Sequence, residues 1–158
     1  MYINSNQCRK ERGFQDTAMM YDLIRSYAEE GKLLHRTLSS IYEHLPCFFV
    51  AEQKGHVIGT VSLHILDKDL AEVRSLTVSS QHFGLGIGKS LVCAVINETK
   101  ALGVQTLLSL TYQVDFFKKC GFQLVDKEKL PMPKIWKDCL HCSKFSSCDE
   151  HAMTVHVL

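Results

Sequence analysis

The sequence lacks the features that define several classes of protein. No apolar run approaches the roughly 18 residues that a membrane-spanning helix needs, and residues 1–13 lack the apolar core of a signal peptide. No basic stripe or tail is present, since 18 basic residues nearly balance 17 acidic ones for a formal net charge of +1. These absences argue against a nucleic-acid partner and against a membrane protein, and they predict a soluble, cytoplasmic protein.

The chain also lacks an internal repeat, a linker and a low-complexity segment. Its 158 residues suit a single domain over residues 1–158, and a hydrophobic content of 46% is enough for a core. Cysteine is present, but the number is odd: seven residues, most of them in apolar segments. We therefore expect reduced thiols rather than a disulfide framework.

Apolar residues follow helical spacing early in the chain and then form short or alternating runs. The spacing predicts one helix that starts at Asp16-Thr17 and stops at Gly31, and a second that Thr37 caps and Pro46 ends. Residues 126–150 read as a long irregular arm. We expect a mixed α/β sheet whose strands lie over residues 47–51, 57–65, 73–78, 106–110, 122–125 and 153–158, the last of them at an edge.

Three glycines at alternate positions, Gly84, Gly86 and Gly88, separate the strand that ends near Val78 from a segment with helical spacing. The order strand, glycine loop, helix places backbone N–H groups and the positive end of a helix dipole at one spot. Such a spot suits a phosphate group. A tight strand-to-helix turn without a ligand is the alternative interpretation.

Three glycine-loop chemistries compete for this segment. A P-loop ends in Gly-Lys-Ser/Thr, as residues 88–90 do, but Phe83 stands where its first glycine is required. A dinucleotide-binding fingerprint fails because Lys89 occupies the position of its third glycine. The diphosphate loop of an acyl-coenzyme A enzyme, G-x-G-x-G at the start of a helix, fits the sequence as it stands.

The stretch AEVRSLTVSSQHFGLGIGKSLV resembles the acetyl-coenzyme A motif of the GNAT superfamily of N-acetyltransferases. Four further stretches, GKLLHRTLSSI, LTYQVDFFKKCGF, IWKDCLHC and CDEHAM, are similar to short, single-domain amino-acid N-acetyltransferases of the N-acetylglutamate synthase type. This resemblance covers most of the chain from Asp16 onward. It implies a mixed, mostly antiparallel central sheet flanked by helices, and transfer of acetyl from acetyl-CoA to the α-amino group of L-glutamate or L-glutamine in arginine biosynthesis.

The resemblance also implies where acetyl-CoA binds. Phe83 departs from the family pattern, which has Gln or Arg there, so the backbone amides of the loop must hold more of the diphosphate. The family uses strand residues for the pantetheine arm and loop residues for the diphosphate; the matching positions are Leu76, Thr77, Val78, Phe83, Gly84, Leu85, Gly86, Ile87, Gly88 and Lys89.

Acetyl transfer by direct attack of an amine needs a base and a proton for the leaving thiolate. Glu72 is our candidate base, with a pairing to Arg74 or simple solvation as the alternative. The tyrosine that protonates the thiolate in much of the superfamily is replaced by Phe at the matching place, residues 116–117. The remaining donors are Ser109, Thr111 and Tyr112, or solvent.

An amino-acid acceptor carries a carboxylate, so cationic side chains are expected around it. Arg36 lies in a stretch that resembles the family's glutamate-binding L-x-x-R, and Arg74 lies two residues after Glu72 on the same strand. Lys134 lies in the arm that we expect to close over the acceptor, with a solvated surface charge as its alternative. Ser109 completes the residues that we expect at the acceptor.

Cys139, Cys142 and Cys148 place three soft ligands within ten residues, with His141, Asp149 or His151 near enough to supply a fourth. A structural zinc ion is one interpretation and unligated thiols are the other, because a second C-x2-C is missing.

Two other functions stay open at this point. The acceptor of a GNAT enzyme can instead be a polyamine, a drug or a protein N-terminus, and the chain can be a non-catalytic module that binds coenzyme A or zinc. Exposed edge strands often pair between copies, which leaves a homodimer open as well.

Overall fold

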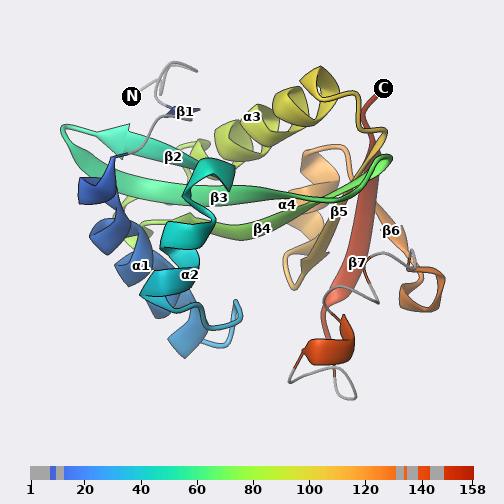
Figure 1. Ribbon diagram of the computed structural model, residues 1–158, viewed down its shortest axis with the longest axis horizontal. Helices are drawn as coiled ribbons and strands as arrows, with labels where there is room; N and C mark the ends of the chain where they lie inside the picture. The colour runs from blue at the N-terminus through green and yellow to red at the C-terminus, as the bar shows by residue number, and fades with distance from the viewer. Residues whose placement is uncertain (1–7, 10–12, 131–133, 135–138, 143–147) are drawn as a thin grey trace. The chain divides into compact units, whose positions relative to one another are not determined.

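In the computed structural model, the described residues are 8–9, 13–130, 134, 139–142 and 148–158 (Figure 1). They form two compact units, one made of the described parts of Met1–Leu63 and Arg74–Asn97, the other of those of His64–Val73 and Glu98–Leu158. Much of the predicted irregular arm, including Pro131, Pro133 and Trp136, lies outside the described residues. The prediction of a single domain stays a prediction.

Two helices open the first unit, α1 (Phe14–Glu29) and α2 (Leu38–Glu43). The Asp16 carboxylate accepts a hydrogen bond from the Gly13 N–H at 3.1 Å, which fixes the start of α1. Thr37 caps α2 as predicted, since its hydroxyl oxygen accepts from the Ser40 N–H at 3.0 Å. Both helices contribute to one apolar core with the strands, made of Met20, Ile24, Ile41, Phe48, Val50 and Val57.

Four strands follow one another in hydrogen-bonded order: β1 (Cys8–Arg9), β2 (Phe48–Gln53), β3 (His56–Asp67) and β4 (Leu70–Val78). The first two belong to the first unit, as do β3 up to Leu63 and β4 from Arg74. A short 3-10 helix, η2 (Leu45–Cys47), leads into β2. Strands β1 to β3 pair antiparallel, with Phe48 opposite Ser62. Lys54 and Gly55 form the tight β2–β3 turn, both with positive φ (50° and 78°), as the favoured hairpin turns require.

The first unit also contains the segment that follows β4. Strand β4 leads through the 3-10 helix η3 (Ser80–His82) to helix α3 (Ile87–Ala101), whose residues up to Asn97 belong to this unit. An apolar stripe at helical spacing is fully buried along α3: Ile87, Leu91, Val92 and Val95.

In the second unit the hydrogen-bonded order is β4, β5 (Thr106–Thr111), β7 (His151–His156) and β6 (Gln123–Val125). Strand β5 runs parallel to β4, and β7 runs antiparallel to both β5 and β6. Helix α4 (Val114–Lys119) packs its Phe117 edge-on against Phe122 at a centroid distance of 5.0 Å. Two short 3-10 helices, η4 (Lys127–Lys129) and η5 (Cys139–His141), complete the described part.

The mixed, mostly antiparallel sheet with flanking helices confirms the predicted fold class. One prediction about it is wrong: the last strand is not at an edge, because β7 pairs with β5 on one side and with β6 on the other. The short strand β6 lies outside it instead. Among the described residues, no helix is both long enough and apolar enough to cross a membrane.

Candidate acetyl-coenzyme A and acceptor site

The glycine loop connects η3 to α3, and two of its glycines have a left-handed backbone. Gly84 has φ 77° and Gly86 has φ 79°, conformations that other residues rarely adopt. A Cβ at either position would meet no atom within 4 Å, so the backbone alone requires glycine and the surface above both stays open. Phe83 and Leu85 are 57% and 42% exposed, so this apolar loop is held by its backbone geometry rather than by burial of its side chains.

The N-terminus of α3 allows the glycine loop to bind an anion. The first turn closes when the Ser90 N–H donates to the Gly86 carbonyl at 3.0 Å. By helix geometry, the N–H groups of Ile87, Gly88 and Lys89 precede this donor and have no carbonyl partner within the helix. Together with the positive end of the helix dipole, they suit a phosphate group. The geometry is what the predicted coenzyme site requires; the binding itself stays a prediction.

Gly59 on β3 positions this helix start, and the sequence reasoning missed it. A Cβ there would lie 2.9 Å from the Thr77 carbonyl oxygen, 3.0 Å from Leu91 and 3.2 Å from Ile87. Any larger residue would therefore push the first turns of α3 away from the strands. An isolated glycine inside a strand is the sequence signal that could have revealed this close approach.

Ser75 interrupts β4 with a left-handed backbone, φ 53°, although it is not glycine and is only 8% exposed. Two contacts fix it: the Thr60 hydroxyl donates to its carbonyl oxygen at 2.8 Å, and Arg36 Nη1 donates to its Oγ at 2.9 Å. A left-handed conformation at a non-glycine residue costs roughly 1–2 kcal/mol and persists where its surroundings enforce it. Nothing in the sequence distinguishes this serine from its neighbours.

Arg36 is half-buried, and Arg74 lies near enough for its positive charge to act on it. Its guanidinium lies 5.2 Å from the centre of the Phe48 ring, and its Nη2 donates to Ser40 Oγ at 3.3 Å. Burial, and next the positive charge of Arg74, lower the pKa of Arg36 from its ordinary value. Arginine nevertheless stays charged at neutral pH. A carboxylate bound here would relieve the repulsion between the two cations, so the structure brings together the two arginines that we predicted at the acceptor.

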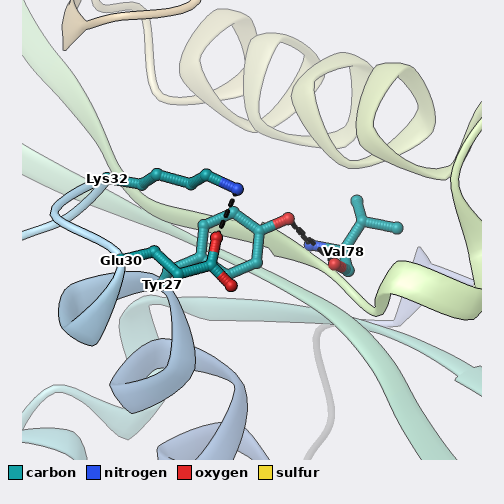
Figure 2. Close-up of polar contacts among 4 residues, drawn as sticks. All are labelled: Tyr27, Glu30, Lys32 and Val78. Atoms are coloured by element: carbon teal, nitrogen blue, oxygen red, sulfur yellow. Dashed lines mark hydrogen bonds and ion pairs between the residues drawn. The ribbon is translucent and has the colours of Figure 1, made fainter.

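At the end of β4, the Tyr27 hydroxyl bonds both backbone groups of Val78 (Figure 2). It donates to the Val78 carbonyl at 2.8 Å and accepts from the Val78 N–H at 3.0 Å. The sequence reasoning expected these backbone groups to be available to the pantetheine arm. In the structure a side chain from α1 occupies them, and the Thr77 hydroxyl is bonded to that of Thr60 at 2.7 Å.

In the second unit, Glu72 and Lys134 form a buried ion pair. Lys134 Nζ donates to Glu72 Oε2 at 2.7 Å, and the two residues are 5% and 3% exposed. The burial of Glu72 contradicts one alternative weighed for it, simple solvation, and Lys134 is a partner that the sequence did not predict. The surface-charge interpretation of Lys134 is wrong, because this side chain is buried. Its ammonium can be buried because the Glu72 carboxylate compensates its charge.

Two of the three candidates for protonating the thiolate are hydrogen-bonded to other groups of the protein. Tyr112 donates a hydrogen bond to Asp149 Oδ1 at 2.6 Å. This hydrogen bond, and next burial, raise the pKa of Tyr112 above its ordinary value. The Thr111 hydroxyl oxygen accepts from the Gln113 N–H at 2.8 Å and keeps its own proton to donate. Ser109 is 2% exposed and lies opposite Val73 in the β4–β5 pairing.

The described residues do not support the predicted zinc site. Among them, no group of three or more His, Cys, Asp or Glu side chains is arranged to hold a metal ion. Cys139, Cys142 and Cys148 are not in disulfide bonds, and Lys127 Nζ lies 3.6 Å from Cys148 Sγ while it donates to the Cys148 carbonyl at 2.7 Å. An ammonium beside a thiol would repel a metal cation.

Comparison with known proteins supports the class that the fold and loop define. Residues 16–122 match the Acetyltransferase (GNAT) family. The chain is 38% identical over 152 residues to an uncharacterized N-acetyltransferase of Chlorobaculum tepidum, covering 94% of this chain and 96% of that protein. The chain belongs to the GNAT family of acetyltransferases and is an N-acetyltransferase by class.

Amino-acid acetyltransferases are among its relatives. That of Mycobacterium tuberculosis is 34% identical over 115 residues, 70% of this chain and 65% of the relative. That of Neisseria meningitidis is 31% identical over 111 residues, 69% of this chain but only 26% of the relative, so the chain spans about a quarter of the longer enzyme.

Among solved structures, Rv2747 from Mycobacterium tuberculosis, in complex with CoA and a ligand designated NLQ, has a TM-score of 0.83 at 26% identity over 96% of this chain and 99% of that one. The N-acetylglutamate synthase of Neisseria gonorrhoeae shares the fold, with a TM-score of 0.83 at 24% identity over 96% of this chain and 35% of that one.

Proposed function

We propose that the chain transfers an acetyl group from acetyl-CoA to the α-amino group of a small amino acid, L-glutamate or L-glutamine. The observation that carries this proposal is the half-buried Arg36, held on Ser75 and close enough to Arg74 for the two charges to interact. Two adjacent guanidinium groups suit a carboxylate, since each can bind both of its oxygens. The amino-acid acetyltransferases among the relatives support the same choice of acceptor.

The loop amides of residues 84–89 hold the diphosphate of the coenzyme in this proposal. This assignment rests on the left-handed glycines and the free first turn of α3. No side chain at Phe83 can add a hydrogen bond, so the affinity for the diphosphate comes from backbone N–H groups and the helix dipole. The CoA that was bound in a solved structural neighbour supports acetyl-CoA as the donor.

The transfer takes place by direct attack. Glu72 accepts a proton from the α-ammonium, and the lone pair of the neutral amine attacks the thioester carbon to form a tetrahedral intermediate. When the intermediate collapses, the C–S bond breaks and its electrons leave on the sulfur. The nitrogen, which is cationic in the intermediate, loses its second proton as the bond breaks, and this proton reaches the thiolate through water or through the Thr111 hydroxyl, which accepts one proton as it donates another. The products are free CoA and the N-acetylated amino acid, and Glu72 returns its proton to solvent. No acyl-enzyme forms.

Cationic acceptors such as polyamines fit the arginine site poorly, because they would meet like charge. A place in arginine biosynthesis is part of the same proposal and rests on the family resemblance. Location in the cytoplasm and assembly as a homodimer stay predictions from the sequence, the second because edge strands can pair between copies.

Release of free thiol from acetyl-CoA, measured with a panel of amino acids, a polyamine and an aminoglycoside, tests the acceptor class. The proposal expects release with glutamate or glutamine above all others. Coenzyme binding without release for any acceptor would instead indicate a regulatory module.

A further inference from the structure

Tyr27 is the last aromatic residue of α1, yet its hydroxyl reaches a strand residue 51 positions later in the chain. It acts on Val78 as both donor and acceptor, with distances of 2.8 Å and 3.0 Å. Figure 2 shows the hydroxyl directed at the Val78 backbone, while the Lys32 ammonium lies 5.4 Å from the ring centre and pairs with Glu30. The hydroxyl therefore forms the two backbone hydrogen bonds with Val78 that a neighbouring strand would otherwise form.

The backbone of the next residue, Ser79, shows which edge of β4 the Tyr27 hydroxyl occupies. The Ser79 N–H donates to the Ile58 carbonyl on β3 at 2.7 Å. Because backbone groups of successive strand residues point to opposite edges, those of Val78 point away from β3. On that side, the pairing of β4 with β5 extends only from Leu70 to Val73 in the described register. Among the described residues, the printed strand pairing on this edge does not reach Val78, where the Tyr27 hydroxyl binds instead, and the chain continues through η3 to the glycine loop.

A strand edge of this kind can bind a secondary amide, which presents one N–H and one C=O in the way a paired strand does. The pantetheine arm of coenzyme A contains two secondary amides, and it must extend from the diphosphate site toward the reacting thioester. The Tyr27 hydroxyl offers the same pair, one donor and one acceptor. The amide and the hydroxyl therefore compete for the same two backbone groups.

We propose that Tyr27 is a further residue of the coenzyme site: its hydroxyl holds the Val78 backbone groups and yields them to a pantetheine amide when the coenzyme binds. The inference rests on the proposed function. Rotation of the side chain is enough for this exchange, because Tyr27 is only half-buried and the adjacent Glu30 and Lys32 are exposed. In the free protein Tyr27 keeps the strand end in place, and its displacement weakens coenzyme binding.

Tyr27→Phe removes the hydroxyl and keeps the ring. Water can reach Val78, which is half-buried, so the backbone groups stay hydrated and the coenzyme amide no longer has to displace a bonded side chain. The inference predicts that the variant binds CoA about 3- to 10-fold more tightly, the fold-change expected for roughly one net hydrogen bond. Its thermal midpoint without coenzyme should be lower than that of the wild type. A purely structural role would lower both stability and affinity.

The experiment is calorimetric titration of CoA into the wild type, Tyr27→Phe and Lys32→Gln, with hydrogen exchange at the Val78 amide as a second readout. Lys32→Gln removes the contact with the ring and keeps the hydroxyl, so its affinity should stay within about 2-fold of the wild type. The Val78 amide should exchange faster in free Tyr27→Phe than in the free wild type, and equally slowly in both with CoA bound.

Different results would refute the role of Tyr27 and the proposed function. If the wild type binds CoA and Tyr27→Phe binds it equally or less tightly, the role of Tyr27 is refuted and the proposed function stands. If the wild type does not bind CoA, the proposed function fails and this inference fails with it.

Discussion

The Lys134 ammonium donates a 2.7 Å hydrogen bond to the Glu72 carboxylate, and both side chains are buried. The carboxylate that we propose as the base is therefore one half of an ion pair, and its catalytic and structural roles must be measured separately. Loss of either partner removes a charge that compensates the other, and breaking a buried ion pair in this way typically costs about 3–5 kcal/mol of unfolding free energy.

Glu72→Gln should lower kcat by about 10²–10⁴-fold, because the amide cannot accept the ammonium proton. Lys134→Met is the matched variant, since it shares the loss of stability but keeps the carboxylate. Its kcat, corrected for the folded fraction, should fall far less. Equal losses of kcat in the two folded variants, measured by thiol release beside thermal unfolding, would mean that Glu72 has only a structural role.

Substitutions of Ser75 test two properties at one residue, its strained backbone and its positioning of Arg36. Ser75→Gly and Ser75→Ala both remove the oxygen that accepts from Arg36, so both should raise the KM for the acceptor by about 3- to 10-fold. Only glycine relieves the left-handed backbone, so Ser75→Gly should be more stable than Ser75→Ala by about 1 kcal/mol. Acceptor KM values that match the wild type would show that Ser75 does not position Arg36.

Arg36→Lys should raise the KM for the amino-acid acceptor by about 10- to 100-fold, which corresponds to one charge-assisted hydrogen bond. Lysine keeps the positive charge but loses the planar fork that holds a carboxylate by two bonds. The KM for acetyl-CoA should stay within about 2-fold of the wild type. The steady-state rates of thiol release with each substrate varied in turn distinguish these effects, and a parallel rise in both KM values would argue against an acceptor site at Arg36.

Gly86 and Gly55 form a matched pair of glycines. Their φ values are 79° and 78°, and a Cβ at either would meet no atom within 4 Å. Alanine should therefore destabilise the protein similarly at both positions, by about 1–2 kcal/mol. Only Gly86→Ala should weaken CoA binding, since Gly55 lies in the β2–β3 turn. Equal CoA affinities of the two variants by calorimetry would contradict the diphosphate site.

Tyr112 should not protonate the thiolate. Its hydrogen bond to Asp149, and next burial, raise its pKa above the ordinary value of 10, so the phenol is a weaker acid than the leaving thiol, and its proton is already donated to Asp149. Tyr112→Phe should change kcat by less than about 3-fold. Any fall in rate between pH 8 and pH 9.5 should persist in the variant. Loss of that limb in Tyr112→Phe would identify Tyr112 as the acid.

Local sequence signals predicted the parts of the fold that depend on local structure. The alternating residues of β3, the cap at Thr37 and the glycines before α3 each specify a conformation within a few residues of chain. The position of β7 was not predictable in this way, because its pairing with β5 joins residues 40 to 50 positions apart, such as Leu107 and Val155. An alternating strand at the end of a chain gives no sign of which neighbours it will have.

The same limit explains what the sequence could not show of the site. The contacts Tyr27–Val78 and Glu72–Lys134 span 51 and 62 residues, and each joins a side chain to a partner that no motif specifies. Serine has no strong preference for a left-handed backbone, so the strain at Ser75 could be seen only in the structure. Arg36 could be predicted from its resemblance to the family, but its orientation depends on that strained serine.

The most direct test of the account is the rate of CoA release from saturating acetyl-CoA with L-glutamate, compared with 4-aminobutyrate, which keeps the amine and one carboxylate but lacks the α-carboxylate. The account predicts release with glutamate that exceeds that with 4-aminobutyrate by about 10-fold or more, because the arginine site binds the α-amino acid through its carboxylate. Equal rates with the two amines, or no release above background with any amino acid, would contradict it.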